Sequence, residues 1–125
     1  MCLSSCLYAD NVKKLLPALA VVESNNNVNA IGDNGKAIGV LQIWKVVVND
    51  VNTVYNTNYT HKNMYNKEKS YKVASLYLKH YGKQYTKQTK KPADLKTLAR
   101  IWNGGPQGYK KPATLKYWNK VKKEI

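Results

Sequence analysis

The sequence predicts a mainly α-helical protein. Apolar residues recur at helical spacing in several segments, and residues that typically cap or end helices stand at the edges of those segments. A length of 125 residues and a hydrophobic content of 43% are enough for one core. We therefore expect a single helical domain over residues 1–125, with residues 1–9 as an N-terminal extension.

The first predicted helix runs from Asp10 to Ser24. Its apolar positions are Val12, Leu15, Leu16, Leu19, Ala20 and Val22. Asp10 is placed to cap its first turn. Pro17 lies inside this helix, so the helix either kinks there or begins near Pro17. The segment SNNNVNAIGDNGKAIG that follows is rich in Asn and Gly, which indicates a loop.

Four further helices are predicted downstream. The segment from Trp44 to Tyr55 has helical periodicity, although its β-branched residues leave a strand possible. Residues 56–69 are expected to form a polar connection. The next helix is expected from Ser70 to Tyr81, with Gly82 ending it and a lysine-rich linker over residues 83–91. Asp94 should cap a helix that Gly104 and Gly105 stop, and a last helix is expected from Pro112 to Lys123.

The net charge of +14 is the strongest global feature, and it favours polyanionic partners such as nucleic acid, anionic lipid or the bacterial wall. Arg100 is the only arginine, and the lysines are scattered along the chain. Because direct base readout relies heavily on arginine, we expect no specific nucleic-acid recognition. A nonspecific phosphate-binding surface and an ordinary solvated lysine surface both remain open.

The chain contains no apolar run of the length that a membrane span needs, so no membrane insertion is expected. The start MCLSSCLYADNVKK lacks the basic-then-apolar order of a secretory signal, which predicts a soluble protein without such a signal. Cys2 and Cys6 would close only a very short loop and are expected to be reduced thiols. We expect a monomer unless the chain is part of a virion.

Glu23 stands out as a carboxylate on an apolar helix face. On the first predicted helix it shares its face with Leu16, Leu19 and Ala20. Burial there would raise its pKa and make it a general acid near neutral pH. The alternative is a glutamate at the helix end that simply reaches solvent.

Three motifs in order give Glu23 a specific context. They are Glu23-Ser24, then Gly39-Val40-Leu41-Gln42-Ile43, then Trp102-Asn103-Gly104-Gly105. A helix ending in Glu-Ser, a loop leading to Gly-x-x-Gln-Ile and an aromatic-Asn-x-Gly helix end resemble the lysozyme-like superfamily. Within it, the soluble lytic transglycosylases and the goose-type lysozymes are most similar. The resemblance covers the chain from about Asp10 to Val121 and implies a lysozyme-like helical domain with a glycine-rich loop lining a substrate cleft.

The resemblance also implies roles for individual residues. Glu23 corresponds to the acid that protonates the glycosidic oxygen between N-acetylmuramic acid and N-acetylglucosamine in peptidoglycan. Ser24 and Gln42 are grouped with the substrate-binding residues, and the Gln42 amide is expected to bond a sugar hydroxyl or acetamido group. Gly39 would allow a close approach of backbone to substrate or to a neighbouring helix.

Trp102 departs from the family, which usually has a tyrosine at this position. The indole is only a donor, so it is expected to bond the glutamate or to stack on a sugar. Asn103 is expected to fix either the loop or the substrate. Tyr109 and Tyr117 are candidates for sugar stacking because they lie near this loop in the sequence.

Asp33 is the candidate for a second catalytic carboxylate, because it is the acidic residue of the glycine-rich loop. Its structural alternative is an Asx turn in Gly-Asp-Asn-Gly. A second carboxylate would favour water-mediated hydrolysis. In the transglycosylase route one glutamate suffices and yields a 1,6-anhydro product. Where the transglycosylases often have a serine in this loop, this chain has Gly32 or Asp33, and this departure favours hydrolysis modestly.

Other chemistries find no support in the sequence. His61 and His80 are far apart in the sequence, with no HExxH pattern, and we expect neither glycine cluster to follow a strand as a phosphate loop does. No metal and no cofactor are therefore expected. The partners expected are peptidoglycan glycan strands and the polyanionic cell wall, which fits a bacteriophage lysin or a virion-borne wall enzyme. The second hypothesis is a non-catalytic basic module that binds wall glycan or nucleic acid.

Overall fold

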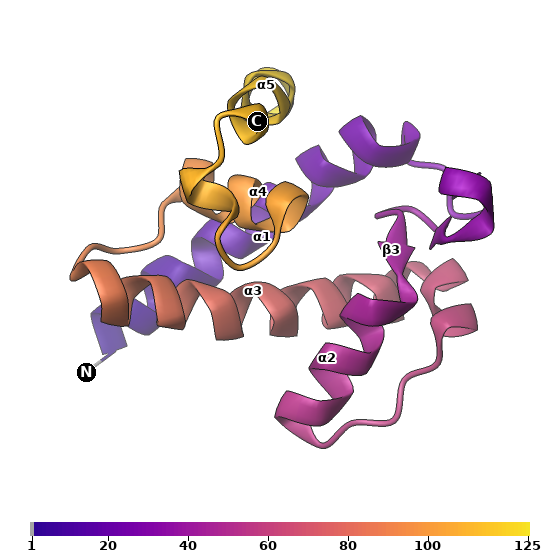
Figure 1. The fold of residues 1–125 in the computed structure, drawn as a ribbon, viewed down its shortest axis with the longest axis horizontal. Coiled ribbons are helices and arrows are strands. Elements are labelled where there is room, and N and C mark those ends of the chain that lie inside the picture. Colours follow the sequence, from indigo (N-terminus) through magenta and orange to yellow (C-terminus); the bar gives the residue numbers. More distant parts are fainter. Residues whose placement is uncertain (1) are drawn as a thin grey trace. The chain divides into compact units, whose positions relative to one another are not determined.

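The computed structural model describes the backbone of residues 2–125 and the side chains of residues 8–125. Five α-helices and three two-residue strands follow in the order shown in Figure 1. They are α1 (Cys2–Ser24), β1 (Ile31–Gly32), β2 (Ala37–Ile38), β3 (Ile43–Trp44), α2 (Lys45–Tyr55), α3 (Lys67–Thr89), α4 (Leu95–Gly104) and α5 (Ala113–Val121). Four 3₁₀ turns accompany them: η1 (Asp33–Gly35), η2 (His61–Tyr65), η3 (Gly108–Lys110) and η4 (Lys122–Glu124). The predicted mainly α fold is confirmed.

The residues fall into two compact units, which are described separately. Unit 1 comprises Met1–Leu19 and Leu78–Ile125, and unit 2 comprises Ala20–Tyr77. Both α1 and α3 therefore contribute residues to each unit. Among the large side chains with almost no exposure, unit 1 contributes Leu15, Leu19, Leu78, Leu98 and Ile101. Those of unit 2 are Val40, Leu41, Ile43, Val48, Val51, Met64 and Val73.

Helix α1 begins eight residues earlier than predicted, at Cys2 instead of Asp10. Asp10 is therefore an exposed residue within the helix and not its N-cap, because no proline or glycine interrupts residues 2–9. The helix also continues through Pro17, whose side chain is exposed. Cys2 and Cys6 lie in this helix, but outside the residues whose side chains are described.

Helix α3 was predicted too short at both ends. It begins at Lys67 and continues to Thr89, so residues 83–89 are helix and not a linker. Gly82, predicted as its C-cap, is a packing residue instead, because a Cβ there would press on Tyr8 and Leu98. The helix ends at Thr89, about two turns later, where Lys90 adopts a positive φ of 62° and its N–H donates to the Thr86 carbonyl.

The C-terminal helices of unit 1 follow the prediction closely. Asp94 caps α4 by accepting a 2.8 Å hydrogen bond from the Thr97 N–H, and Gly105 follows its end at φ 86°. Helix α4 packs on α5. Arg100 holds the intervening loop, donating through Nε to Thr114 Oγ1 at 2.8 Å and through a terminal nitrogen to the Lys111 carbonyl at 3.0 Å.

Unit 2 contains the sheet that the sequence analysis missed. The three strands form an antiparallel sheet in the order β1-β2-β3, with Ile31 opposite Ile38 and Ile38 opposite Ile43. The expectation that no strand precedes the first glycine cluster was therefore wrong. Helix α2 follows directly and is a helix as predicted, with Asn56 in the left-handed conformation after its last residue.

Tyr77 gives unit 2 a pH-dependent contribution to stability. Burial, assisted by the nearby Asp50 carboxylate, raises the pKa of Tyr77 from 10.0 to about 12. An unfolded chain therefore releases this proton near pH 10 while the folded chain keeps it, so the unfolding free energy should fall between pH 10 and 12 by roughly 1–3 kcal/mol. Urea unfolding of wild type and Tyr77→Phe over this range should show a shallower decline in the variant. Parallel declines would contradict the assignment.

Candidate active site

Glu23 lies in the last turn of α1 and is half-buried within unit 2. The helix ends here in an αL C-cap motif: Asn25 N–H donates to the Val21 carbonyl at 2.8 Å, and Asn26 N–H donates further back to the Ala20 carbonyl at 3.1 Å. Asn25 and Asn26 both have positive φ, 54° and 63°. The motif fixes the backbone immediately after Glu23, so the carboxylate is presented from a well-defined helix end.

Ser24 ties this helix end to the rest of unit 2. Its hydroxyl donates to the Val40 carbonyl at 2.7 Å, and its oxygen accepts from the Asn27 N–H at 3.0 Å. A further contact of 3.2 Å reaches the Ala20 carbonyl. The only hydroxyl proton is therefore directed at the protein backbone. These bonds hold the backbone next to Glu23, and the assignment of Ser24 to the substrate-binding residues stays a prediction.

The Gly-x-x-Gln motif forms a tight turn between β2 and β3. Gln42 N–H donates to the Gly39 carbonyl at 3.1 Å, and both end residues have positive φ, 81° at Gly39 and 52° at Gln42. A Cβ on Gly39 would overlap the Met64 carbonyl of η2. Gly39 therefore permits a close backbone approach, as predicted, and the backbone that approaches it is that of η2. Val40 and Leu41 of the same turn are fully buried.

The Gln42 side chain is used mainly by the protein itself. Its Nε2 donates to the Gly39 carbonyl at 3.0 Å and to the Ala30 carbonyl at 3.2 Å, which engages both amide protons. Its Oε1 lies beside Gly32, where a Cβ would overlap it. The amide therefore closes the loop between residues 30 and 39, and only the carbonyl oxygen remains to accept a bond from a sugar.

Asp33 lies in the loop that Gln42 closes. It is exposed, has a left-handed φ of 49°, and accepts a hydrogen bond from the Lys36 N–H through its backbone carbonyl at 3.2 Å. Among the described residues, no backbone N–H is seen to donate to the Asp33 carboxylate, as an Asx turn would require. Unit 2 thus brings together Glu23, Ser24, Asp33, Gly39 and Gln42, all of the predicted site residues that precede α2.

The remaining predicted residues belong to unit 1. Trp102 is half-buried near the end of α4 and Asn103 beside it is exposed. Tyr109 packs edge-to-face on Tyr85 at a centroid distance of 4.7 Å, and its hydroxyl lies 3.5 Å from Gln88 Oε1. The half-buried Tyr117 lies on α5. The predicted placement of the loop over residues 25–36 opposite Trp102 stays a prediction.

Sequence reasoning missed Trp44, an exposed aromatic residue in unit 2. It follows the Gly-x-x-Gln-Ile motif directly, and its side chain is 39% exposed. The other two tryptophans, Trp102 and Trp118, are half-buried. Its position next to the motif was the available signal.

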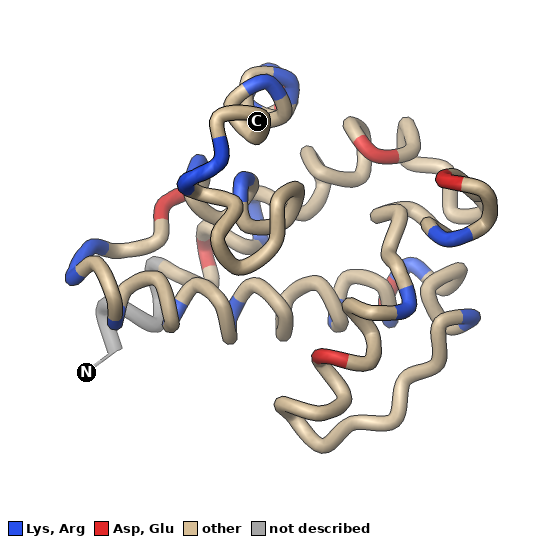
Figure 2. The backbone as a smooth tube through the Cα atoms, viewed as in Figure 1, with Lys and Arg blue, Asp and Glu red and all other residues tan. Residues whose placement is uncertain are grey.

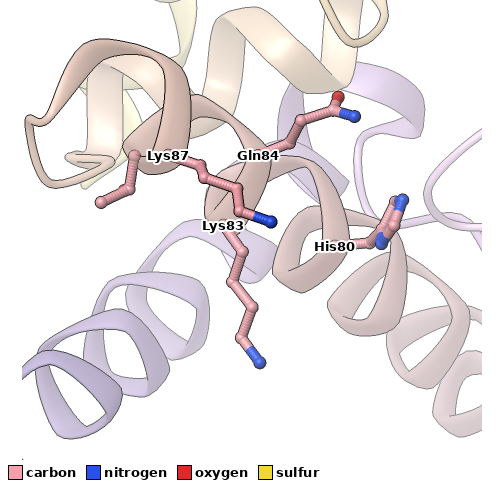
Figure 3. A pocket seen from close by; sticks show the side chains of 5 residues that line it. His80, Lys83, Gln84 and Lys87 are labelled. Carbon is pink, nitrogen blue, oxygen red and sulfur yellow. The ribbon is translucent and has the colours of Figure 1, made fainter.

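A cavity of about 550 Å³, open to solvent, lies along the C-terminal half of α3 in unit 1. Figure 3 shows its lining of His80, Lys83, Gln84 and Lys87, which are joined by Thr86. None of the predicted site residues lines it. Its basic character reflects a wider asymmetry: unit 1 holds 15 basic and 3 acidic residues, for a net +12, whereas unit 2 holds 6 and 4, for a net +2.

No cluster of three or more histidine, cysteine, aspartate or glutamate residues is placed to hold a metal ion in the part of the chain that the structure describes. None of the described helices combines the length and apolarity that crossing a membrane requires.

Comparison with known proteins identifies the family. The model of the family described as "Transglycosylase SLT domain" matches residues 7–125. The chain belongs to this family. Its curated relatives include lysozymes of Magallana gigas (45% identical over 51 residues), Ostrea edulis (43% over 54) and Meretrix lusoria (44% over 50). These matches span 40–43% of this chain and only 37–41% of the relatives' own lengths.

The SLT-family assignment agrees with a solved structure. A chain in the crystal structure of Aeromonas hydrophila PliI in complex with Meretrix lusoria lysozyme superposes with a TM-score of 0.67 at 31% identity. The match covers 89% of this chain and 88% of that one. The lysozyme-like fold predicted from the three motifs is therefore confirmed.

Proposed function

We propose that this SLT-family chain cleaves the β-1,4 bond between N-acetylmuramic acid and N-acetylglucosamine in peptidoglycan, with Glu23 as the general acid. One observation carries the proposal: the αL C-cap and the Ser24 hydrogen bond to the Val40 carbonyl tie the end of α1, which carries Glu23, to the Gly39–Gln42 turn. The lysozyme relatives supply the reaction class.

In this mechanism the Glu23 carboxyl donates its proton to the glycosidic oxygen as the bond to the muramic acid carbon breaks. The leaving sugar departs as a neutral alcohol, and the Glu23 carboxylate then acts as a base. We favour water as the nucleophile, with Asp33 as the second carboxylate, because Asp33 is exposed in the same unit. Attack by the muramic acid's own 6-hydroxyl, giving an anhydro product, is the alternative outcome.

Some residues of the proposed site bind the glycan, and others hold the backbone around it in place. Gln42 offers its carbonyl oxygen, while Ser24 and Gly39 keep the backbone around it in place. Trp102, Asn103 and Tyr109 stay proposed contacts to the glycan, by stacking or by hydrogen bonding.

A turbidity assay on purified peptidoglycan separates an enzyme from a binding module. Clearing by the wild-type protein, and none by folded Glu23→Gln, supports the enzyme. The second candidate function, a non-catalytic basic module, is favoured by the net charge of +12 in unit 1, and it predicts unchanged turbidity with both proteins. Figure 2 shows basic residues, drawn in blue, distributed along the elements of this unit.

Wall binding should weaken as salt is added. Exposed lysines act through a field that is screened over about 8 Å at physiological ionic strength, whereas pocket contacts to a glycan are less sensitive. We expect affinity for walls that carry anionic polymers to fall several-fold between 50 and 300 mM salt, measured by cosedimentation of Glu23→Gln protein. Glycan stripped of those polymers is the control. An equally steep loss on the stripped glycan would show that charge is the whole interaction.

A further inference from the structure

Trp44 has an exposed aromatic side chain that does not cap the helix that follows it. It ends β3 and precedes the first residue of α2, and its side chain forms no capping hydrogen bond to that helix. Large aromatic side chains are usually well buried, and an exposed one beside an active site is a common means of binding a ligand ring. Trp44, 39% exposed directly after the Gly-x-x-Gln-Ile motif, is therefore a candidate for binding a ligand ring.

The register of the sheet places Trp44 on the same face as the Gln42 carbonyl oxygen. Gly32 lies opposite Ala37, and Ala37 lies opposite Trp44, so the side-chain positions of all three point to one face. Gln42 Oε1 occupies the space that a side chain on Gly32 would fill. Ala37 between them is almost completely buried. An acceptor oxygen and an exposed indole thus stand two strand spacings apart, roughly 10 Å.

Lys36 adds a positive charge to this face. Its Nζ lies 5.6 Å from the centroid of the Trp44 ring, which is a long cation–π contact between two exposed side chains. Such a contact is weak at an exposed position, so a ligand ring can displace the ammonium. The displaced ammonium would remain close enough to pair with an anionic group on that ring.

We infer that Trp44 stacks on a sugar ring of the glycan and that Lys36 pairs with the free carboxylate of a muramic acid that carries no stem peptide. The pair would select this acidic residue over its neutral neighbour in an alternating, peptide-free glycan. This inference rests on the proposed function and extends it, because it names the residues that distinguish an acidic glycan from a neutral one. Both residues belong to the unit that holds Glu23.

The test compares two ligands on the inactive Glu23→Gln protein by calorimetry: a neutral N-acetylglucosamine oligomer, and a peptide-free glycan oligomer that carries muramic acid carboxylates. Trp44→Ala should weaken binding of both about tenfold, and Trp44→Tyr should restore most of the affinity, as stacking requires. Lys36→Gln should weaken only the acidic ligand, by about three- to tenfold, and the loss should shrink at high salt. Val46→Ala, which trims another exposed apolar side chain near the strand, is the matched control.

Thermal unfolding of each variant separates binding from folding, and Trp44→Tyr keeps the test decisive if Trp44→Ala is unstable. Unchanged affinity in a folded Trp44→Ala protein, or equal losses for both ligands in Lys36→Gln, would overturn the inference. Failure of the wild-type protein to bind or cleave any glycan would instead overturn the proposed function. Cleavage that is intact and insensitive to Trp44 would overturn only the present inference.

Discussion

Replacing Glu23 with glutamine is expected to lower the rate of peptidoglycan cleavage by about 10²–10⁴-fold, because the amide keeps the size of the side chain but has no acidic proton to donate. Initial rates of turbidity loss measure the effect. Glu68→Gln is the matched control, since Glu68 is an exposed glutamate of the same unit on α3 and should leave the rate unchanged. A folded Glu23→Gln protein with wild-type activity would remove the acid from the mechanism.

The Asp33→Asn variant tells the two nucleophiles apart. If water attacks with help from Asp33, this variant should also lose most of its turnover. If the muramic acid 6-hydroxyl attacks, the change should matter little. Because Asp33 is exposed and its carboxylate supports no hydrogen bond identified for the described residues, a large loss of activity would not come from a loss of stability.

Gly39→Ala is expected to destabilise the protein by about 2–5 kcal/mol. A left-handed backbone costs a non-glycine residue roughly 1–2 kcal/mol, and forcing atoms into a packed site costs about 1–3 kcal/mol more. Both costs apply, because Gly39 has φ 81° and its Cβ would overlap the Met64 carbonyl. Urea unfolding gives the difference in free energy.

Gly35→Ala is the control for the backbone term alone. Gly35 has a similar φ of 87°, but a Cβ there meets nothing within 4 Å. It should therefore cost only about 1–2 kcal/mol. Equal losses at the two positions would show that the close approach to Met64 contributes nothing to stability.

Much of the helical framework could be predicted because its signals are local. The Asp94 cap and the glycines after α4 act over a few residues, and both lie where the pattern placed them. Gly82 was misassigned because a glycine that ends a helix and one that makes room for a neighbour look the same in the sequence. Only the packing of Tyr8 and Leu98 against it distinguishes the two.

The residues of the candidate site could be named from the motifs, but the hydrogen bonds among them could not be predicted. The motifs located Glu23, Gly39 and Gln42. However, the positive φ of Gln42 and the use of its amide by the Ala30 and Gly39 carbonyls depend on a turn that brings distant residues together. The short strands escaped prediction because two-residue strands carry no alternating pattern. Trp44 was overlooked for the same reason, since its exposure follows from that sheet.

Mass spectrometry of the soluble products from purified peptidoglycan tests the central claim most directly. The account predicts muropeptides newly ended at muramic acid, released by the wild-type protein and absent with Glu23→Gln. It favours the hydrolytic mass over the anhydro mass, which is lighter by one water. Anhydro ends would contradict only the choice of nucleophile. Intact glycan strands after incubation with folded wild-type protein would contradict the claim that this chain cleaves peptidoglycan.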